Sequence, residues 1–168
     1  LKQSAGDSPY DALHEEFEPE PLLALADKIG RGEQYLADFQ TALHHEKPSF
    51  RYWAATGLAV LGEHAEPAND ELLNDLDDTS PPVRFAAAEA LCSLGKETKA
   101  VRLLAKGLLN ENVVNQLHAS QILLVIGNKA KPAVPEMKKA LKQLGDLPDR
   151  AWYTRENLTY MLESFGEM

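Results

Sequence analysis

Apolar residues recur along this chain with the period of an α-helix, and each apolar stretch ends at a glycine. The residues one, four, five and eight positions before each of these glycines are nearly all apolar. Such offsets fall on one stripe of a helix with 3.6 residues per turn, and glycine often ends a helix in the left-handed conformation. The glycines are Gly30, Gly62, Gly95, Gly127 and Gly166, at intervals of 32, 33, 32 and 39 residues.

A second apolar stripe follows each of the first four glycines. In the second and fourth cases we expect the second helix to include Ala65 and Ala130, respectively. Prolines lie near the expected helix starts, and Thr79 or Ser80 can cap the helix that begins near Pro81. The pattern therefore predicts a helix hairpin of about 33 residues, repeated about four and a half times.

One hairpin cannot bury both of its faces, so neighbouring hairpins are expected to stack. The predicted fold is all-α, a right-handed α-α superhelix of about four to five helix hairpins. Composition agrees, because 26 Leu and 22 Ala outnumber 7 Val and 3 Ile, and β-branched residues favour strands. The expected repeat units are residues 19–46, 47–79, 80–111, 112–145 and 146–168, after a linker or irregular N-terminal cap over residues 1–18.

Small residues in the middle of the first helices, such as Ala54, Ala87 and Ala119, are expected to let adjacent repeats approach closely. Charges at fixed positions predict polar contacts between repeats. Asp77 and Asp78 end one hairpin, and an arginine lies near the start of the next. We expect these acidic and basic side chains to form a ladder of contacts between repeats. The alternative is a set of solvated charges, worth about 0–1 kcal/mol per pair. The position eleven residues before each glycine holds Arg51, Arg84, Gln116 and Arg155 in the last four repeats.

The segment from Ser80 to Leu91, read as SPPVRFAAAEAL, resembles the HEAT repeat in the short form also found in phycobilin lyases. A narrower resemblance involves Ser8-Pro9-Tyr10-Asp11 and the helix from Phe50 to Leu58, FRYWAATGL. Both are similar to segments of the HEAT tail that follows the catalytic domain of some bacterial sulfatases. The HEAT resemblance implies that the second helix of each hairpin lines the concave face of the solenoid.

The net charge of the chain limits the kinds of partner that it can be expected to bind. The chain carries a net charge of -9, which argues against a nucleic-acid binder. Residues 1–80 sum to -12 and residues 81–168 to +3. Basic residues nevertheless gather on two second helices, where they predict either a docking face for an acidic partner or a solvated surface. These residues are Lys99, Arg102, Lys106, Lys138, Lys139 and Lys142.

The sequence contains few residues in patterns that would indicate catalysis or metal binding. Sulfatases use a Cys or Ser within Cys/Ser-x-Pro-x-Arg, whereas Cys92 is followed by Ser-Leu-Gly-Lys and is expected to be a buried hydrophobe. One HEAT-fold hydroxylase binds iron through His-Glu pairs that follow the Val-Arg of the first helix in each repeat. Here that position reads Tyr52-Trp53 in one repeat, so His45-Glu46 is not expected to bind a metal, and no cofactor is predicted. In the aromatic pairs Tyr52-Trp53 and Trp152-Tyr153, we expect one ring to pack in the core and the other to cover the edge of the hairpin. The alternative is a platform on which a sugar ring stacks.

We therefore expect a non-catalytic protein-interaction or domain-positioning module. The sulfatase resemblance implies the C-terminal tail of an exported bacterial enzyme, in the periplasm or outside the cell, whose partner is its own catalytic domain. The alternative is a free-standing HEAT adaptor or a lyase-like chaperone of a small pigment. A sulfated glycan is a weaker candidate partner, and no membrane span is predicted. The chain begins at Leu1 with no signal peptide, which suggests a fragment or a processed product.

Overall fold

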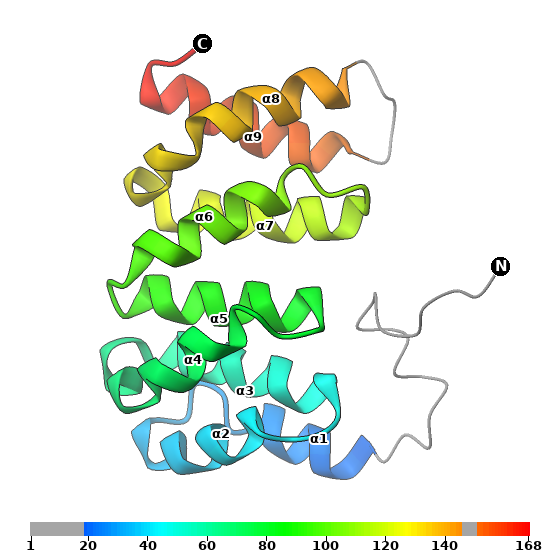
Figure 1. Ribbon diagram of the computed structural model, residues 1–168. Helices are drawn as coiled ribbons and strands as arrows, with labels where there is room; N and C mark the ends of the chain where they lie inside the picture. Colours follow the sequence, from blue (N-terminus) through cyan, green and yellow to red (C-terminus); the bar gives the residue numbers. More distant parts are fainter. Residues whose placement is uncertain (1–18, 146–150) are drawn as a thin grey trace, which may run out of the picture. The chain divides into compact units, whose positions relative to one another are not determined.

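The computed structural model describes residues 19–145 and 151–168 (Figure 1). These residues form helices and no strand, so the prediction of an all-α, HEAT-like fold is confirmed. The α-helices are α1 (Pro19–Ala26), α2 (Leu36–Leu43), α3 (Pro48–Leu61), α4 (Asn69–Asp75), α5 (Pro81–Ser93), α6 (Glu97–Gly107), α7 (Val113–Ile126), α8 (Val134–Leu144) and α9 (Trp152–Phe165).

Two compact units make up the chain, and the boundary between them falls after Lys96. The boundary lies between α5 and α6, inside the predicted repeat 80–111. The remaining helices fall within the other predicted repeats, whose boundaries stay predictions, as does the right-handed path of the array. The expected linker or cap over residues 1–18 lies outside the described residues.

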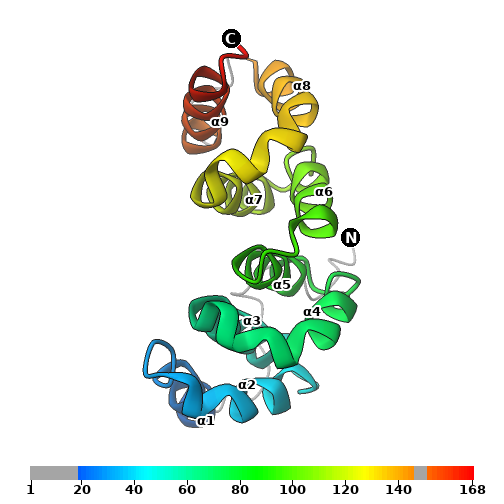
Figure 2. The same cartoon turned by 90° about the vertical axis from the view of Figure 1, so that its left-hand side faces the viewer.

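In the first unit, α3 packs against α1, α2 and α5, and α4 packs against α5. Figure 2 shows α3 and α5 in one layer of this unit and α4 in the other. Small residues line the helices that meet, since Ala54, Ala55 and Ala87 are fully buried. Their burial provides the close approach that the alanine-rich segments predicted.

Gly57 makes room for one aromatic ring in this unit. Phe39 on α2 is fully buried, and a Cβ atom on Gly57 would lie only 2.5 Å from its Cε1 atom. Glycine normally weakens a helix interior, by about 1 kcal/mol relative to alanine. At this position the missing side chain lets α2 and α3 pack around the ring.

In the second unit, α7 packs against α6 and α9, and α9 also packs against α8. The view in Figure 2 places α7 and α9 in one layer and α6 and α8 in the other. Asn157 on α9 donates a 3.1 Å hydrogen bond to the buried hydroxyl of Ser120 on α7. Neighbouring hairpins in this unit therefore share a polar contact as well as an apolar one.

All five repeat glycines have a positive φ, as the helix-end pattern predicted. Two of them do more than end a helix. Gly62 (φ 57°, ψ -130°) and Gly127 (φ 58°, ψ -125°) each begin a seven-residue 3-10 helix, over Gly62–Ala68 and Gly127–Ala133. The second α-helix of these repeats therefore starts later than the apolar stripes predicted. Each segment contains a proline, Pro67 or Pro132, whose ring clashes with the carbonyl of the residue four positions earlier in an α-helix, so the α-helix starts only after it.

Candidate interaction surface

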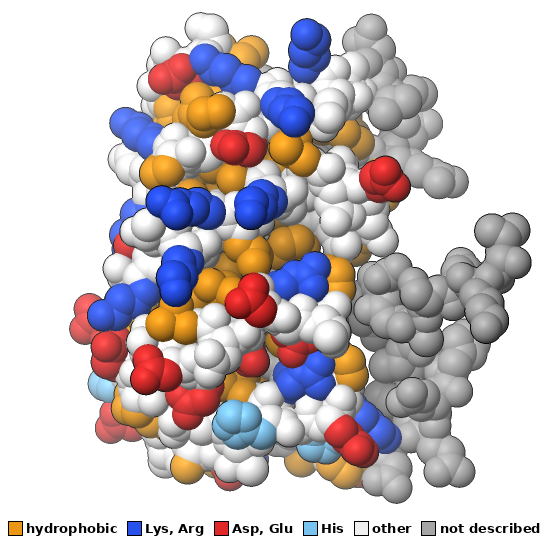
Figure 3. All heavy atoms as spheres, in the orientation of Figure 1, with side chains coloured by type: hydrophobic (Ala, Val, Ile, Leu, Met, Phe, Trp, Pro, Cys, Tyr) orange, Lys and Arg blue, Asp and Glu red, His pale blue; other side chains and the backbone are white. Residues whose placement is uncertain are grey.

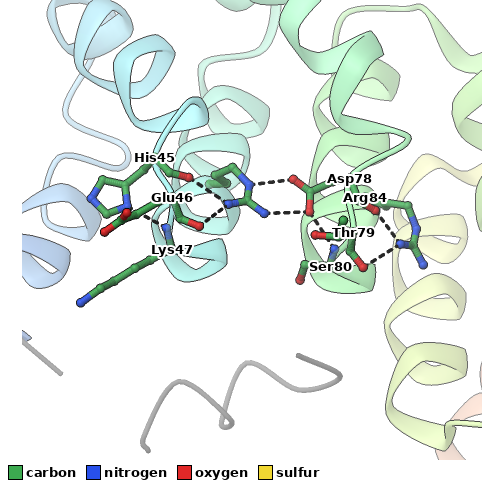
Figure 4. Close-up of polar contacts among 8 residues, drawn as sticks. His45, Glu46, Lys47, Asp78, Thr79, Ser80 and Arg84 are labelled. Atoms are coloured by element: carbon green, nitrogen blue, oxygen red, sulfur yellow. Dashed lines mark hydrogen bonds and ion pairs between the residues drawn. The ribbon is translucent and has the colours of Figure 1, made fainter. Parts of the chain in front are cut away.

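The same polar turn precedes three of the first helices. A side chain six residues before the repeated Arg or Gln accepts a hydrogen bond from the backbone N–H of the residue that caps the next helix. Asp78 Oδ1 accepts from the amide of Ser80 at 2.7 Å (Figure 4). The other two bonds are Lys47 N–H to His45 Nδ1 at 3.0 Å and Asn112 N–H to Asn110 Oδ1 at 2.8 Å.

The repeated Arg or Gln side chain ties each turn to its helix. Arg84 donates to the carbonyl of Asp78 at 2.6 Å, and Gln116 donates to the carbonyl of Asn110 at 2.7 Å. Arg51 donates in the same way to the carbonyls of His45 (2.9 Å) and Glu46 (2.8 Å). Arg155 donates to the carbonyls of Leu144 and Gly145. The repeated position thus satisfies carbonyl groups that a helix hairpin leaves without partners.

Arg51 also reaches the next turn of the first unit. Its Nε and Nη2 atoms donate to the two carboxylate oxygens of Asp78 at 2.7 and 2.9 Å, and both side chains are largely buried, at 14% and 8% exposed. Burial works to raise the pKa of Asp78. The bonds from Arg51 and from the Ser80 amide outweigh it, so the pKa is lowered. The bond to Asp78 likewise raises the pKa of Arg51.

Not every residue of the predicted ladder takes part. Arg84 uses the backbone carbonyls of Asp78 and Thr79, and no salt bridge to a described carboxylate is recorded for it. Asp77 is exposed and also has no ion pair within the described chain. Ser80 caps α5 with its backbone conformation alone, because its side chain makes no capping bond. The carboxylate of Asp78 instead accepts from the amide of Ser80, just before the first turn of α5, a contact that the capping prediction missed.

Asp75, on α4, lies near the Arg51–Asp78 pair. Its Oδ2 atom is buried and has no hydrogen-bond partner in the described structure. Burial, followed by the negative charge of Asp78, raises the pKa of Asp75 to about 6, while Arg51 and His44 act in the opposite direction. This carboxyl group therefore keeps its proton to a higher pH in the folded chain than an ordinary aspartate does.

The predicted basic residues lie on α6 and α8 of the second unit, and these two helices contact each other. Each of the six side chains is exposed. Along α6, Lys99, Arg102 and Lys106 follow the helical period and share one side of the helix. Figure 3 shows Lys and Arg side chains gathered over these two helices. We call the six residues, Lys99, Arg102, Lys106, Lys138, Lys139 and Lys142, the basic surface.

Carboxylates neutralise only part of the positive charge in this unit. Lys138 pairs with Glu167 at 2.7 Å, and Lys129, beside the basic surface, pairs with Glu97 at 2.5 Å. The bonds from these lysines lower the pKa of both glutamates. Among the described residues, no ion pair is recorded for the other five members of the basic surface. The surface therefore keeps a net positive charge toward solvent.

Two of the described side chains that could carry chemistry, Cys92 and His118, lie mostly out of contact with solvent. Cys92 is buried within α5. His118 is largely buried, which lowers its pKa. No group of three or more His, Cys, Asp and Glu side chains among the residues described could hold a metal ion. Over the same residues, no helix is long and apolar enough to cross a bilayer.

The two aromatic pairs differ. Tyr52 and Trp53 are partly buried, with ring centroids 5.5 Å apart, and burial raises the pKa of Tyr52. Trp152 and Tyr153 on α9 are 52% and 66% exposed, so the packing interpretation is wrong for this pair. A helical wheel of α9 could have found this difference, because both residues lie away from its buried stripe of Leu158 and Leu162.

Comparison with known proteins agrees with this geometry. A family model described as HEAT repeats matches residues 36–119, which is half of the 168 residues. No curated protein matches the chain. The sulfatase and phycobilin-lyase resemblances therefore rest on the quoted residues alone. HEAT repeats commonly mediate protein binding. The chain belongs to the HEAT-repeat family.

Proposed function

We propose that this chain is a non-catalytic protein-interaction module that binds an acidic segment of a partner through the basic surface. The observation that supports this proposal is the set of five exposed cations on α6 and α8 that have no recorded ion pair in the described structure. Charges of one sign on neighbouring helices raise the local concentration of an oppositely charged ligand and steer its approach.

The net charge of the chain favours an acidic peptide over a nucleic acid. A nucleic acid long enough to extend beyond the basic surface would be repelled by the rest of a chain whose overall charge is -9. A short acidic segment feels mainly the nearby cations, because salt screens charges beyond about 8–10 Å. Lys99 and Lys106 are seven residues apart, or about 10 Å along the helix. An extended segment can therefore contact several cations at once.

Charge reversal tests the proposal. We expect the wild-type chain to bind a synthetic Glu-rich peptide, measured by fluorescence anisotropy. The variant Lys138→Glu/Lys139→Glu/Lys142→Glu should bind at least about tenfold more weakly. A matched control, Lys28→Glu/Lys47→Glu/Lys96→Glu, changes the net charge equally in the first unit and should retain most of the affinity.

Two results would contradict the proposal. One is equal affinity of the wild-type chain and the first variant. The other is binding of heparin, a sulfated polysaccharide, through the same lysines without any binding of the acidic peptide. That second result would indicate that the basic surface binds a sulfated glycan instead of an acidic peptide.

The finer proposal is that the partner is the catalytic domain of the same polypeptide, an exported bacterial sulfatase. The similarity of Phe50–Leu58 to the sulfatase tail supports it, and Ser8-Pro9-Tyr10-Asp11, which lies outside the described residues, adds to it. A Cys/Ser-x-Pro-x-Arg motif in the reading frame upstream of Leu1 is the expected result. An upstream frame without a hydrolase domain would favour the free-standing adaptor or the lyase-like chaperone.

A further inference from the structure

Helix α9 carries a stripe of aromatic and acidic side chains that the basic surface does not explain. Tyr153 and Tyr160 are 66% and 64% exposed, and Glu156 and Glu163 lie between and beyond them on the same side of the helix. Trp152 borders the stripe. On the opposite side, α9 buries Leu158, Met161 and Leu162.

This stripe differs from the corresponding positions of the other first helices. Ten and three residues before the helix-ending glycine, α3, α5 and α7 carry no charged side chain, whereas α9 carries Glu156 and Glu163. Thirteen and six residues before it, α9 carries Tyr153 and Tyr160. The corresponding residues of the other helices are Ser49 and Thr56, Pro82 and Glu89, and Val114 and Gln121. Exposed glutamates alone would keep this side of α9 well solvated. The exposed tyrosines are not needed for that purpose.

The geometry points to a second docking surface, formed by Trp152, Tyr153, Glu156, Tyr160 and Glu163, for a helix of another protein that presents Lys or Arg every three or four residues. Aromatic rings attract a cation over their faces, and carboxylates pair with it. A lysine or arginine satisfies both kinds of group, whereas an acidic segment would be repelled by the glutamates. No ion pair is recorded for Glu156 or Glu163 within the described chain, so both are available to such a partner.

Part of this surface is organised before a partner arrives. The rings of Trp152 and Tyr153 meet edge to face, with centroids 4.8 Å apart and an interplanar angle of 72°. Their contact restricts the rotamers of both side chains, which lowers the entropy lost on binding. From Trp152 to Glu163 the surface is about 16 Å long, or about three helical turns. This length suits one amphipathic helix.

Peptide binding to the intact chain tests this inference. The probe is a fluorescently labelled helical peptide of about four turns, with Lys at every third or fourth position and Ala and Leu elsewhere. Binding is followed by anisotropy. The variant Glu156→Gln/Glu163→Gln should weaken binding about fivefold, and Tyr153→Ser/Tyr160→Ser about tenfold. Tyr160→Phe keeps an aromatic face and should stay within about twofold of wild type.

The control is Glu46→Gln/Glu63→Gln, which makes the same chemical change at two exposed glutamates of the first unit and should leave affinity within about twofold. Circular dichroism checks that each variant is folded. Equal loss of affinity in this control and in Glu156→Gln/Glu163→Gln would overturn the inference, because binding would then follow net charge alone. Absence of binding to the Lys-rich peptide would also overturn it. Neither result bears on the basic surface, which lies on other helices and takes a ligand of opposite charge.

Discussion

Loss of the Asp78 carboxylate is expected to destabilise the first unit strongly. Asp78→Ala removes two charge-assisted hydrogen bonds from Arg51 and one from the Ser80 amide. Breaking a buried ion pair costs about 3–5 kcal/mol. Here Arg51 keeps two carbonyl acceptors, so we expect a loss of about 2–3 kcal/mol in the free energy of unfolding. The effect should appear in urea denaturation followed by circular dichroism.

A double-mutant cycle separates this pair from general damage. Arg51→Met, Asp78→Ala and the double variant should give a coupling energy of at least about 1.5 kcal/mol. The neighbouring control Asp77→Ala should cost less than about 0.5 kcal/mol, since Asp77 is exposed. Additive single effects would refute the reasoning.

The pH dependence of Asp78→Ala follows from the lowered pKa of Asp78. Folding favours the ionised form, so the stabilisation is present above the unfolded pKa of 3.8 and is lost as the pH falls through the folded value. The difference between wild type and Asp78→Ala should therefore shrink in acid.

Three further changes probe the packing and the second carboxylate. Ala87→Glu places a charge at a fully buried position and should unfold the array cooperatively, at a cost of more than about 3 kcal/mol; an unchanged thermal melt would contradict this. Gly57→Ala should cost about 1–2 kcal/mol in urea denaturation because of the Phe39 ring, and Phe39→Leu should restore part of that loss. Asp75→Asn should add about 1 kcal/mol of stability at a pH of about 7.5 and less at a pH of about 5. The folded pKa of Asp75, about 6, lies above its ordinary 3.8, so its charge opposes folding as the pH rises; equal effects at both pH values would be inconsistent with this.

Helical periodicity predicted most of the fold because burial follows the apolar stripe. Gly62 and Gly127 end their helices as expected, and Ala65 and Ala130 are buried as their stripes require. The stripe did not distinguish an α-helix from a 3-10 helix, since both can bury these alanines. Pro67 is the local signal that could have done so.

The polar turns and the α9 surface were harder to predict. His45, Asp78 and Asn110 occupy one repeated position, but histidine is not a typical turn residue, so their common role becomes visible only in the hydrogen bonds. Exposed aromatic residues such as Tyr153 were missed because large rings in a repeat usually pack in the core. By contrast, the exposure of the basic residues followed directly from their place opposite the apolar stripes of α6 and α8.

Chemical-shift mapping of the complete chain with the Glu-rich peptide tests the proposed binding role most directly. Amide and side-chain resonances of α6 and α8 should shift in a saturable manner, and those of α2 and α4 should not. The shifts should weaken with added salt, because the contact is made by exposed charges. Shifts spread evenly over the chain, or centred on the acidic helices of the first unit, would contradict the assignment of the basic surface as the docking site.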